Sequence, residues 1–249
     1  MRISVVNEIK CSHCGAPLAF DPGEMLATCK YCGFTVVIET GEPFTLEHSL
    51  IINRYDQTQV EEPIRGWMKA GFLKPSDLAR KAKLTEKNLT YLPFWVVSAR
   101  ATSTYKGVFE RIAPAVVKEG KIEKEYDWLV LARKTAEFPT REYEVPLEGK
   151  IPYDFRKIEA FAHVLNSEID KTEAEELTRQ EIDENHRFLA QQDIDRIVDF
   201  KTEMKIEETV YLHAPVWFVK YEYKGKDYKL LIEGTTGAAI KGDIPSIKL

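Results

Sequence analysis

The chain contains four cysteines, and all of them lie in two Cys-x-x-Cys-Gly segments near the N-terminus. The first segment is Cys11-Ser12-His13-Cys14-Gly15 and the second is Cys29-Lys30-Tyr31-Cys32-Gly33. Each pair fits a tight turn that directs two thiolates at one metal ion, because the glycine lets the backbone curl until N–H groups face the sulfurs. Fourteen residues separate the two pairs, which is enough for a hairpin that brings them together.

Four thiolates in a tetrahedron at ~2.3 Å form a closed structural Zn²⁺ site with no open position for a substrate. We therefore predict one structural zinc ion bound by Cys11, Cys14, Cys29 and Cys32. Iron fits the same geometry, because such a site selects for soft ligands and shape. Four reduced structural thiols are the alternative without a metal. We expect His13 to be an exposed spacer, since four thiolates already complete the coordination shell.

The length and composition describe a globular protein with a small metal domain and a larger body. With 249 residues, about 200 remain for a body with its own core. Hydrophobic residues make up 44% and charged residues 30%, as in globular proteins. No apolar run approaches the ~18 residues of a membrane span, and the N-terminus lacks the pattern of a secretory signal. Paired cysteines with none left over favour a reducing compartment, so we expect a cytoplasmic protein.

The charge balance argues against a general nucleic-acid coat, which needs a basic surface. The net charge is −5, and residues 1–42 carry three basic and five acidic side chains. Four thiolates with one Zn²⁺ would add about −2 more. Asparagine and glutamine are scarce, with five of each, which favours a thermophilic source.

Hydrophobic periodicity predicts the helices of the body. Apolar residues spaced three and four apart predict helices over residues 57–71 and 155–166. Pro75 begins a shorter helix that ends near Leu84. Thr172, with Glu175 completing a capping box, predicts the start of a charged helix over residues 172–192.

Runs of β-branched and aromatic residues predict strands over 89–105 and 128–133, with an edge strand at 143–146. Strands near 196–208, 209–223, 227–233 and 238–241, separated by glycine turns, predict a C-terminal β-meander. The expected fold class is α+β: a small N-terminal zinc ribbon followed by an antiparallel-sheet body with a few packing helices. We place the ribbon at residues 1–42 and the body at 43–249, because Gly41-Glu42-Pro43 breaks the preceding strand.

The body contains a short internal similarity. Residues 91–97 resemble residues 215–219, and a Tyr-Lys-Gly turn follows each of them. We interpret this as two related β-hairpin units, around residues 89–107 and 209–241, although chance similarity of two aromatic strands is the alternative. Trp95 and Trp217 could line a groove for a peptide or a single strand, but we expect them to be core residues.

Several of these motifs together resemble a known family. They are the two cysteine segments, Tyr91-Leu92-Pro93-Phe94-Trp95, and a terminal block with Ala214-Pro215-Val216-Trp217 and Gly234-Thr235-Thr236-Gly237. In this order they resemble an uncharacterised zinc-ribbon family of bacteria and archaea, often labelled TFIIB-type zinc-ribbon-containing proteins. The resemblance implies a zinc ribbon but no established activity. The label does not imply transcription, because ribbons occur with many functions.

The remaining polar residues give no catalytic signature. The sequence has no Gly-x-Ser-x-Gly, Walker-type or His-Glu-x-x-His motif. The acidic residues Asp193, Asp195, Asp199 and Glu203 could hold a divalent cation, but we interpret them as a solvated junction between a helix and a strand.

We therefore expect a non-enzymatic binding or scaffold protein that engages a protein partner. We also expect that replacing Cys11 or Cys29 with Ser releases the metal and unfolds residues 1–40 while the body stays folded. An enzyme whose site is assembled from distant residues is a third hypothesis. The main alternative is a nucleic-acid-binding ribbon protein that uses the basic residues Arg54, Arg65, Lys69, Lys74, Arg80, Lys81, Lys83 and Lys87.

Overall fold

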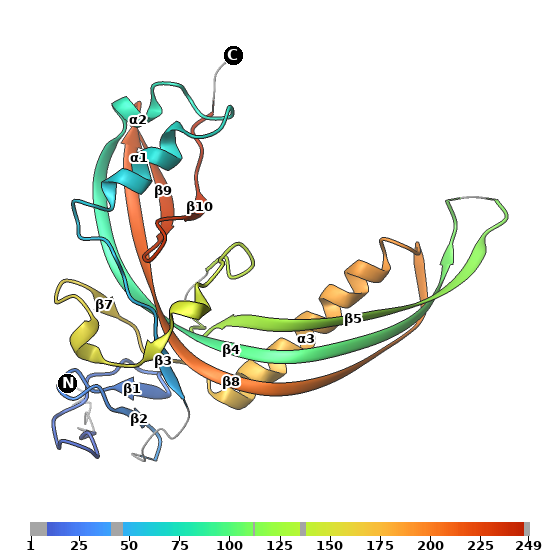
Figure 1. Ribbon diagram of the computed structural model, residues 1–249, viewed down its shortest axis with the longest axis horizontal. Coiled ribbons are helices and arrows are strands. Elements are labelled where there is room, and N and C mark those ends of the chain that lie inside the picture. The colour runs from blue at the N-terminus through green and yellow to red at the C-terminus, as the bar shows by residue number, and fades with distance from the viewer. Residues whose placement is uncertain (1–8, 41–46, 112, 135–137, 247–249) are drawn as a thin grey trace, which may run out of the picture. The chain divides into compact units, whose positions relative to one another are not determined.

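The computed structural model describes residues 9–40, 47–111, 113–134 and 138–246 (Figure 1). These residues form a mixed α+β structure with one eight-stranded sheet, one two-stranded sheet and few helices, so the expected fold class is confirmed at this level. The chain divides into two compact units. Unit 1 comprises residues 1–94, 131–168 and 211–249, and unit 2 comprises residues 95–130 and 169–210.

In unit 1, the first cysteine segment precedes a two-stranded sheet and the second connects its two strands. Its strands β1 (Leu26–Thr28) and β2 (Thr35–Val37) are antiparallel, with Leu26 opposite Val37. A small core lies under this sheet and includes Cys11, Cys29 and Val36, each at most 2% exposed. The predicted boundary at residues 41–43 lies outside the described residues.

The larger sheet of unit 1 is built on the C-terminal part of β8 (Arg196–Tyr223). Its strands follow the order β10-β9-β8-β3-β6, and β4 pairs with β8 and β7. Helix α1 (Glu61–Lys69) contributes Ile64 and Met68 to the core of this unit, which also contains Trp217 and Tyr221. The other elements are β3 (His48–Leu50), α2 (Leu78–Lys81), β4 (Lys83–Phe109), β6 (Ile151–Pro152), β7 (His163–Val164), β9 (Lys226–Glu233) and β10 (Ala239–Gly242).

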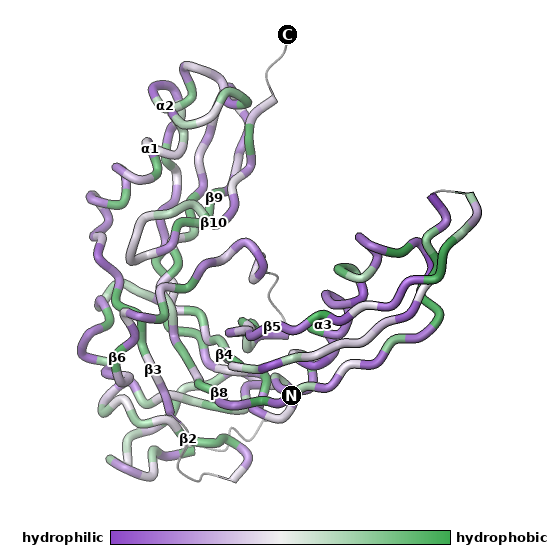
Figure 2. Tube along the Cα trace, turned by 45° about the vertical axis from the view of Figure 1, so that its right-hand side comes forward, coloured by the Kyte–Doolittle hydropathy of each residue, from purple (hydrophilic) through white to green (hydrophobic). Residues whose placement is uncertain are grey.

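Unit 2 is a sheet of long strands with one helix along it (Figure 1). The sheet contains β5 (Val116–Leu131), which pairs with β4, and the N-terminal part of β8. Helix α3 (Lys171–Ala190) buries every fourth residue from Ala174 to Ala190, while β4 buries every second residue from Trp95 to Ser103. These are the periods of a helix face and a strand face that pack together. Hydrophilic and hydrophobic residues accordingly alternate along these strands (Figure 2).

The structure corrects several expected elements. The sheet is not wholly antiparallel, because β3 runs parallel to β8 and β7 runs parallel to β4. β3 and β7 are only three and two residues long, too short to give a sequence pattern. The two strands expected over 196–223 are one continuous strand, and Tyr105–Gly107 lies inside β4 rather than at a turn, so residues 89–107 are not a hairpin.

The helix expected over residues 155–166 is also wrong. A short 3-10 turn, η2 (Phe155–Lys157), is followed by a non-helical segment with a turn at residues 160–161 and then by β7. Ile158, Ala162 and Val164 pack against the core of unit 1 without a helix, so their spacing reflects burial alone. The edge strand expected at 143–146 is absent from these described residues, where η1 (Leu147–Gly149) follows.

Helices α1, α2 and α3 are present near their expected positions. Helix α3 is capped by Asp170, whose side chain accepts a hydrogen bond from the Glu173 N–H at 2.8 Å, and not by Thr172. No helix among the described residues is both long and apolar enough to cross a membrane.

Candidate metal centre

The two Cys-x-x-Cys-Gly segments fold into the same turn. In the first turn, the Cys11 N–H donates to the Ala16 carbonyl and the Gly15 N–H donates to the Cys11 carbonyl, both at 2.8 Å. In the second turn, the Cys29 N–H donates to the Phe34 carbonyl and the Gly33 N–H donates to the Cys29 carbonyl, again both at 2.8 Å. Gly15 and Gly33 have φ of +73° and +76°, a region that side chains disfavour. The repeated sequence therefore produces a repeated backbone.

The two turns bring all four sulfurs together. Cys11 Sγ lies 3.6 Å from Cys32 Sγ, and Cys14 Sγ lies 3.6 Å from Cys29 Sγ. All four Sγ atoms lie within 4.8 Å of one another. A tetrahedron with metal–sulfur bonds of ~2.3 Å has edges of ~3.8 Å, so this arrangement fits one zinc-type ion. The spacing is too long for disulfides, which require ~2.05 Å.

The electrostatics of the cluster also fit a cation. Burial would raise the pKa of Cys11, but the N–H groups of Cys14 and His13 face its sulfur and lower its pKa to about 7. Burial, which outweighs the hydrogen bond from the Phe34 N–H, raises the pKa of Cys32 to about 12. Four adjacent thiolates repel one another, so a bound cation is needed to keep all of them ionised.

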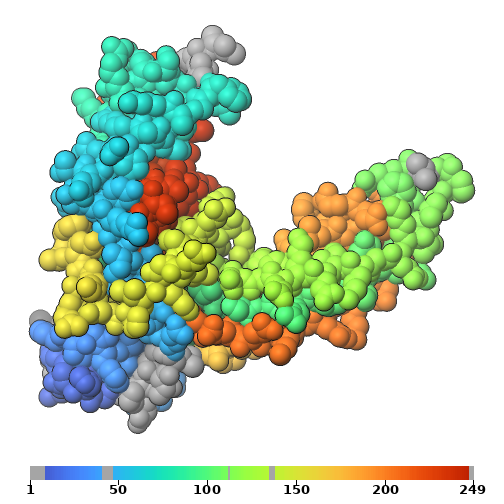
Figure 3. All heavy atoms as spheres, in the orientation of Figure 1, coloured from blue at the N-terminus to red at the C-terminus, as the bar shows by residue number. Residues whose placement is uncertain are grey.

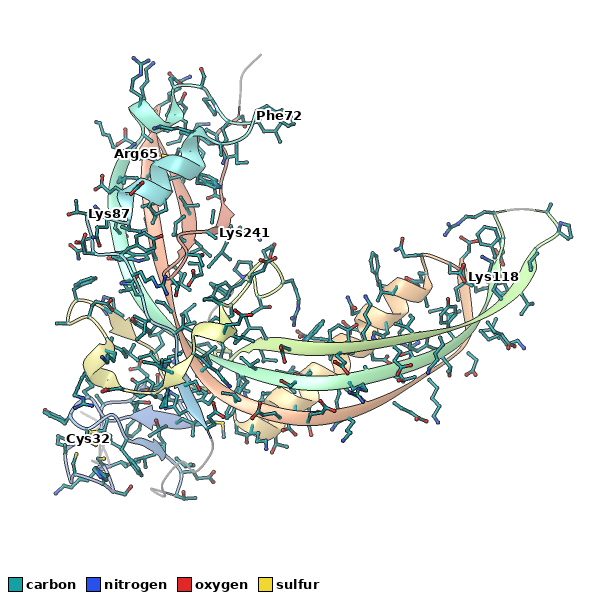
Figure 4. All side chains as sticks on the ribbon, viewed as in Figure 1. Cys32, Arg65, Phe72, Lys87, Lys118 and Lys241 are labelled. Carbon is teal, nitrogen blue, oxygen red and sulfur yellow. The ribbon has the colours of Figure 1, made fainter. Side chains whose placement is uncertain are left out.

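The cluster lies at the surface of the ribbon-like segment. Cys11 and Cys29 are 2% and 0% exposed, while Cys14 and Cys32 are exposed (Figure 4 labels Cys32). His13 is exposed and its ring stacks on Phe34, with centroids 5.2 Å apart, so it is a spacer as expected. Among the described residues, only these four cysteines form a group that could hold a metal ion.

A buried ion-pair network attaches this segment to the rest of unit 1. Arg133 contacts Glu24 at 2.7 Å and Glu168 at 2.9 Å, and all three side chains are at most 10% exposed. Glu24 also accepts a hydrogen bond from the Asn166 amide at 2.8 Å. The Met25 N–H donates to the Ser167 carbonyl at 2.6 Å. Sequence reasoning missed this network, because 109 residues separate Glu24 from Arg133.

A second connection is a chain of hydrogen bonds that begins on β1 and β2. The hydroxyls of Thr28 and Thr35 are 3.1 Å apart, and Thr35 Oγ1 is 2.9 Å from Nδ1 of His48. His48 bonds to His213, whose Nε2 lies 2.8 Å from the Leu165 carbonyl. In the sequence the two histidines are isolated residues 165 positions apart, so nothing in it pairs them.

The acidic cluster of the sequence is divided among separate ion pairs. Asp193 contacts Lys118 at 2.7 Å, and Asp195 contacts Arg111 at 2.7 Å. Glu203 contacts Lys201 at 2.6 Å. Asp193 and Asp195 therefore lie at the junction between α3 and β8, as interpreted, whereas Asp199 and Glu203 are exposed residues inside β8.

The tryptophans of the internal similarity are core residues, as expected. Trp95 and Trp217 are both 0% exposed. The Trp95 indole N–H donates to the Ile169 carbonyl, and that of Trp217 donates to Oδ1 of Asn53, both at 2.9 Å. Neither indole is available to a ligand in this conformation.

Half of the basic residues in the stretch 54–87 make contacts within the protein. Arg65, which is labelled in Figure 4, donates to the carbonyls of Ala79 and Ala82, each at 2.8 Å. It therefore joins α1 to α2. Lys74 donates to the Trp67 carbonyl, Lys81 pairs with Asp77, and Lys87 pairs with Glu61. The other four, which are exposed, are Arg54, Lys69, Arg80 and Lys83.

Unit 2 contains a serine–histidine pair that the sequence did not indicate. Ser103 Oγ lies 2.7 Å from Nδ1 of His186, and Nε2 of His186 lies 2.8 Å from the hydroxyl of Tyr126. Ser103 lies on β4 and His186 on the buried face of α3, both are 0% exposed, and burial lowers the pKa of His186. A substrate could reach Ser103 only if α3 moved away, so this pair joins the helix to the sheet.

The second cysteine turn borders a pocket. Tyr31, at the tip of the turn, is 75% exposed. Together with Cys32 and residues 151–157 it lines a pocket of about 580 Å³, whose walls include Ile151 and Phe155.

Comparison of the chain with protein-family models, with curated proteins and with solved structures finds no match. The resemblance to a zinc-ribbon family therefore rests on the motifs alone.

Proposed function

We propose that the protein is a non-enzymatic, cytoplasmic binding protein whose N-terminal zinc ribbon engages a protein partner. The observation that carries this proposal is Tyr31, an exposed aromatic ring beside a pocket that has both apolar residues, such as Ile151 and Phe155, and charged residues in its walls. Tyrosine is enriched at protein interfaces, because its ring contributes a large contact area and its hydroxyl a hydrogen bond.

The zinc ion has a structural role in this proposal. It would bind Cys11, Cys14, Cys29 and Cys32 and hold both turns in place. The buried network of Arg133 with Glu24 would hold the ribbon against the rest of unit 1, so that Tyr31 is presented in one orientation. A preordered contact residue loses less entropy when a partner binds.

A binding role is also supported by the placement of the polar residues. The serine–histidine pair in unit 2 is buried, and the acidic residues of the junction are paired with cations. A protein is favoured over nucleic acid because four of the eight basic residues in the stretch 54–87 already have partners within the chain. Nucleic acid remains an outcome of the test.

The test is a crosslinking pull-down from an extract of the source cells, with and without nuclease treatment. We expect one protein to be retained after nuclease treatment by the zinc-loaded wild type and lost with Tyr31→Ala. The matched control is Phe188→Ala, which removes another ring, 61% exposed, on α3 of unit 2. A set of captured molecules that disappears with nuclease would favour nucleic acid, and equal capture by Tyr31→Ala would contradict the role of the ribbon.

A further inference from the structure

The loop between α1 and α2 exposes two adjacent apolar side chains. Phe72 is 90% exposed and Leu73 is 62% exposed. Gly71, with φ of +91°, turns the chain immediately before them. The loop stands out from the surface of unit 1 (Figure 3), with Phe72 on its outer side (Figure 4). Single exposed apolar residues are common, but an adjacent protruding pair is a feature of binding surfaces.

A cationic pocket lies beside this loop. It has a volume of about 720 Å³, and its lining includes Lys74, Lys224 and Lys226. The Lys74 ammonium donates to the Trp67 carbonyl at 2.5 Å and lies 3.7 Å from the centroid of the Trp67 ring, so this charge is held in place. Lys224 and Lys226 are exposed around the turn between β8 and β9.

The acidic side chain in this pocket is already engaged. Asp77 contacts Lys81 at 2.8 Å and accepts a hydrogen bond from the Tyr223 hydroxyl at 2.7 Å. The segments 71–77 and 223–228 carry three basic side chains (Lys74, Lys224 and Lys226) and two acidic ones (Asp77 and Asp227), whereas the whole chain has a net charge of −5. Positive charge is therefore concentrated next to the exposed apolar pair.

We propose that this tip of unit 1, formed by residues 71–77 and 223–228, is a docking surface for an anionic lipid membrane. Phe72 and Leu73 enter the interfacial layer, and the exposed Lys224 and Lys226 bind phosphate groups of the lipids. Lys74, whose ammonium is held by Trp67, adds its charge to the pocket. Each contribution alone gives weak binding, but an apolar insertion and a basic cluster together give a stable anchor.

The shape of the tip favours a membrane over other anionic partners. A convex loop with a nearly fully exposed ring enters a deformable lipid layer, whereas a protein partner would need a matching cavity. Single-stranded nucleic acid binds to rows of aromatic rings, and Phe72 is a single exposed ring at this tip. This inference does not depend on the partner proposed for the ribbon, because Tyr31 is not part of the tip.

The test is co-sedimentation of the full-length, zinc-loaded protein with vesicles. Vesicles of phosphatidylcholine alone are compared with vesicles that also contain phosphatidylglycerol, at low and high salt. We expect binding only to the anionic vesicles and weaker binding at high salt. Phe72→Ser with Leu73→Ser, and separately Lys224→Glu with Lys226→Glu, should each weaken binding roughly tenfold or more.

Matched controls remove the same side-chain types from unit 2. Phe188→Ser replaces another exposed ring, and Lys121→Glu with Lys201→Glu reverses two exposed charges. Both controls should bind the vesicles as the wild type does. In addition, Phe72→Trp should show a blue shift of the new indole emission on anionic vesicles, which reports insertion.

Three results would overturn the proposal. The first is no binding of the wild type to anionic vesicles at low salt. The second is equal loss of binding in the control variants. The third is binding of a single-stranded oligonucleotide that depends on Phe72 without any binding to vesicles, which would assign the tip to nucleic acid instead.

Discussion

His48 and His213 are hydrogen-bonded to each other inside unit 1, with Nε2 of His48 2.8 Å from Nδ1 of His213. The Leu165 carbonyl can only accept, so Nε2 of His213 carries a proton. With His213 neutral, which its burial favours by lowering its pKa, its Nδ1 accepts from His48. Nδ1 of His48 then accepts from the Thr35 hydroxyl. With both rings neutral, the contacts define one direction of donation along the chain.

The first prediction concerns pH. Burial lowers the pKa of His213 to about 4, and burial together with His213 lowers the pKa of His48 well below 6.5. Both folded-state values lie below the unfolded value of ~6.5, so as the pH falls the unfolded chain takes up protons that the folded chain does not. The free energy of unfolding should be highest above pH 6.5 and fall by up to ~1.4 kcal/mol per pH unit for each ring below it.

Urea unfolding of the zinc-loaded protein between pH 7.5 and pH 5 measures this slope. His213→Gln should lower the stability at pH 7.5 and reduce the slope below pH 6.5. His163→Gln, which changes an exposed histidine on β7, is the control and should keep the wild-type slope. A slope that is unchanged in His213→Gln would show that the pair does not control the pH dependence.

The second prediction concerns the buried arginine. Arg133→Met leaves Glu24 and Glu168 buried without their cation, so the free energy of unfolding should fall by about 3–5 kcal/mol. Arg100→Met is the control, because Arg100 and its partner Glu125 are 52% and 72% exposed. Thermal and urea unfolding should detect no change for this exposed pair. Similar effects of the two substitutions would contradict the role assigned to the buried network.

The metal cluster could be predicted from the sequence because its determinants are local. Each turn is defined by five consecutive residues, and two copies with a suitable spacer place the four sulfurs together. The connections that hold the segment in place could not be predicted. The bond between His48 and His213 joins positions 165 residues apart, and which residues meet across a sheet depends on strand register.

The secondary structure could be predicted where a pattern extended over many residues. Helix α3 and the long strands β4 and β8 gave clear periods, whereas β3, β6 and β7 have three residues or fewer. The segment 155–166 has a helical spacing of apolar residues but no α-helix, because these residues pack against the core from a non-helical backbone. Apolar spacing thus reports which residues are buried, and only indirectly which backbone buries them.

The third prediction tests which residue, Asp170 or Thr172, caps the N-terminus of α3. The side chain of Asp170 accepts a hydrogen bond from the Glu173 N–H, whereas Thr172 lies inside the first turn and is exposed. Asp170→Ala should therefore lower the stability of unit 2 by about 1 kcal/mol, since an N–H of the first turn loses its acceptor. Thr172→Ala should have little effect. Hydrogen exchange of the α3 amides measures both, and the reverse order would restore Thr172 as the cap.

The fourth prediction concerns the extent of unfolding when the metal is lost. Cys32→Ser or a chelator should abolish stoichiometric zinc binding, and His13→Ala should not. The Met25 N–H bonds to Ser167, and the Thr28 N–H bonds to Asn166 at 3.1 Å, so the cysteine-bearing segment is continuous with the rest of unit 1. We therefore expect loss of the metal to lower the Tm of unit 1 by on the order of 10 °C.

Hydrogen exchange locates this effect along the chain. After chelation, amides of residues 163–168 should exchange faster together with those of residues 9–40, because the two segments share hydrogen bonds and the Arg133 network. Amides of α3 in unit 2 should keep their protection and serve as the internal control. If only residues 9–40 lose protection, the segment unfolds independently and the boundary predicted at residue 42 describes a separate domain. If residues 163–168 lose protection as well, the zinc ion stabilises unit 1 as a whole.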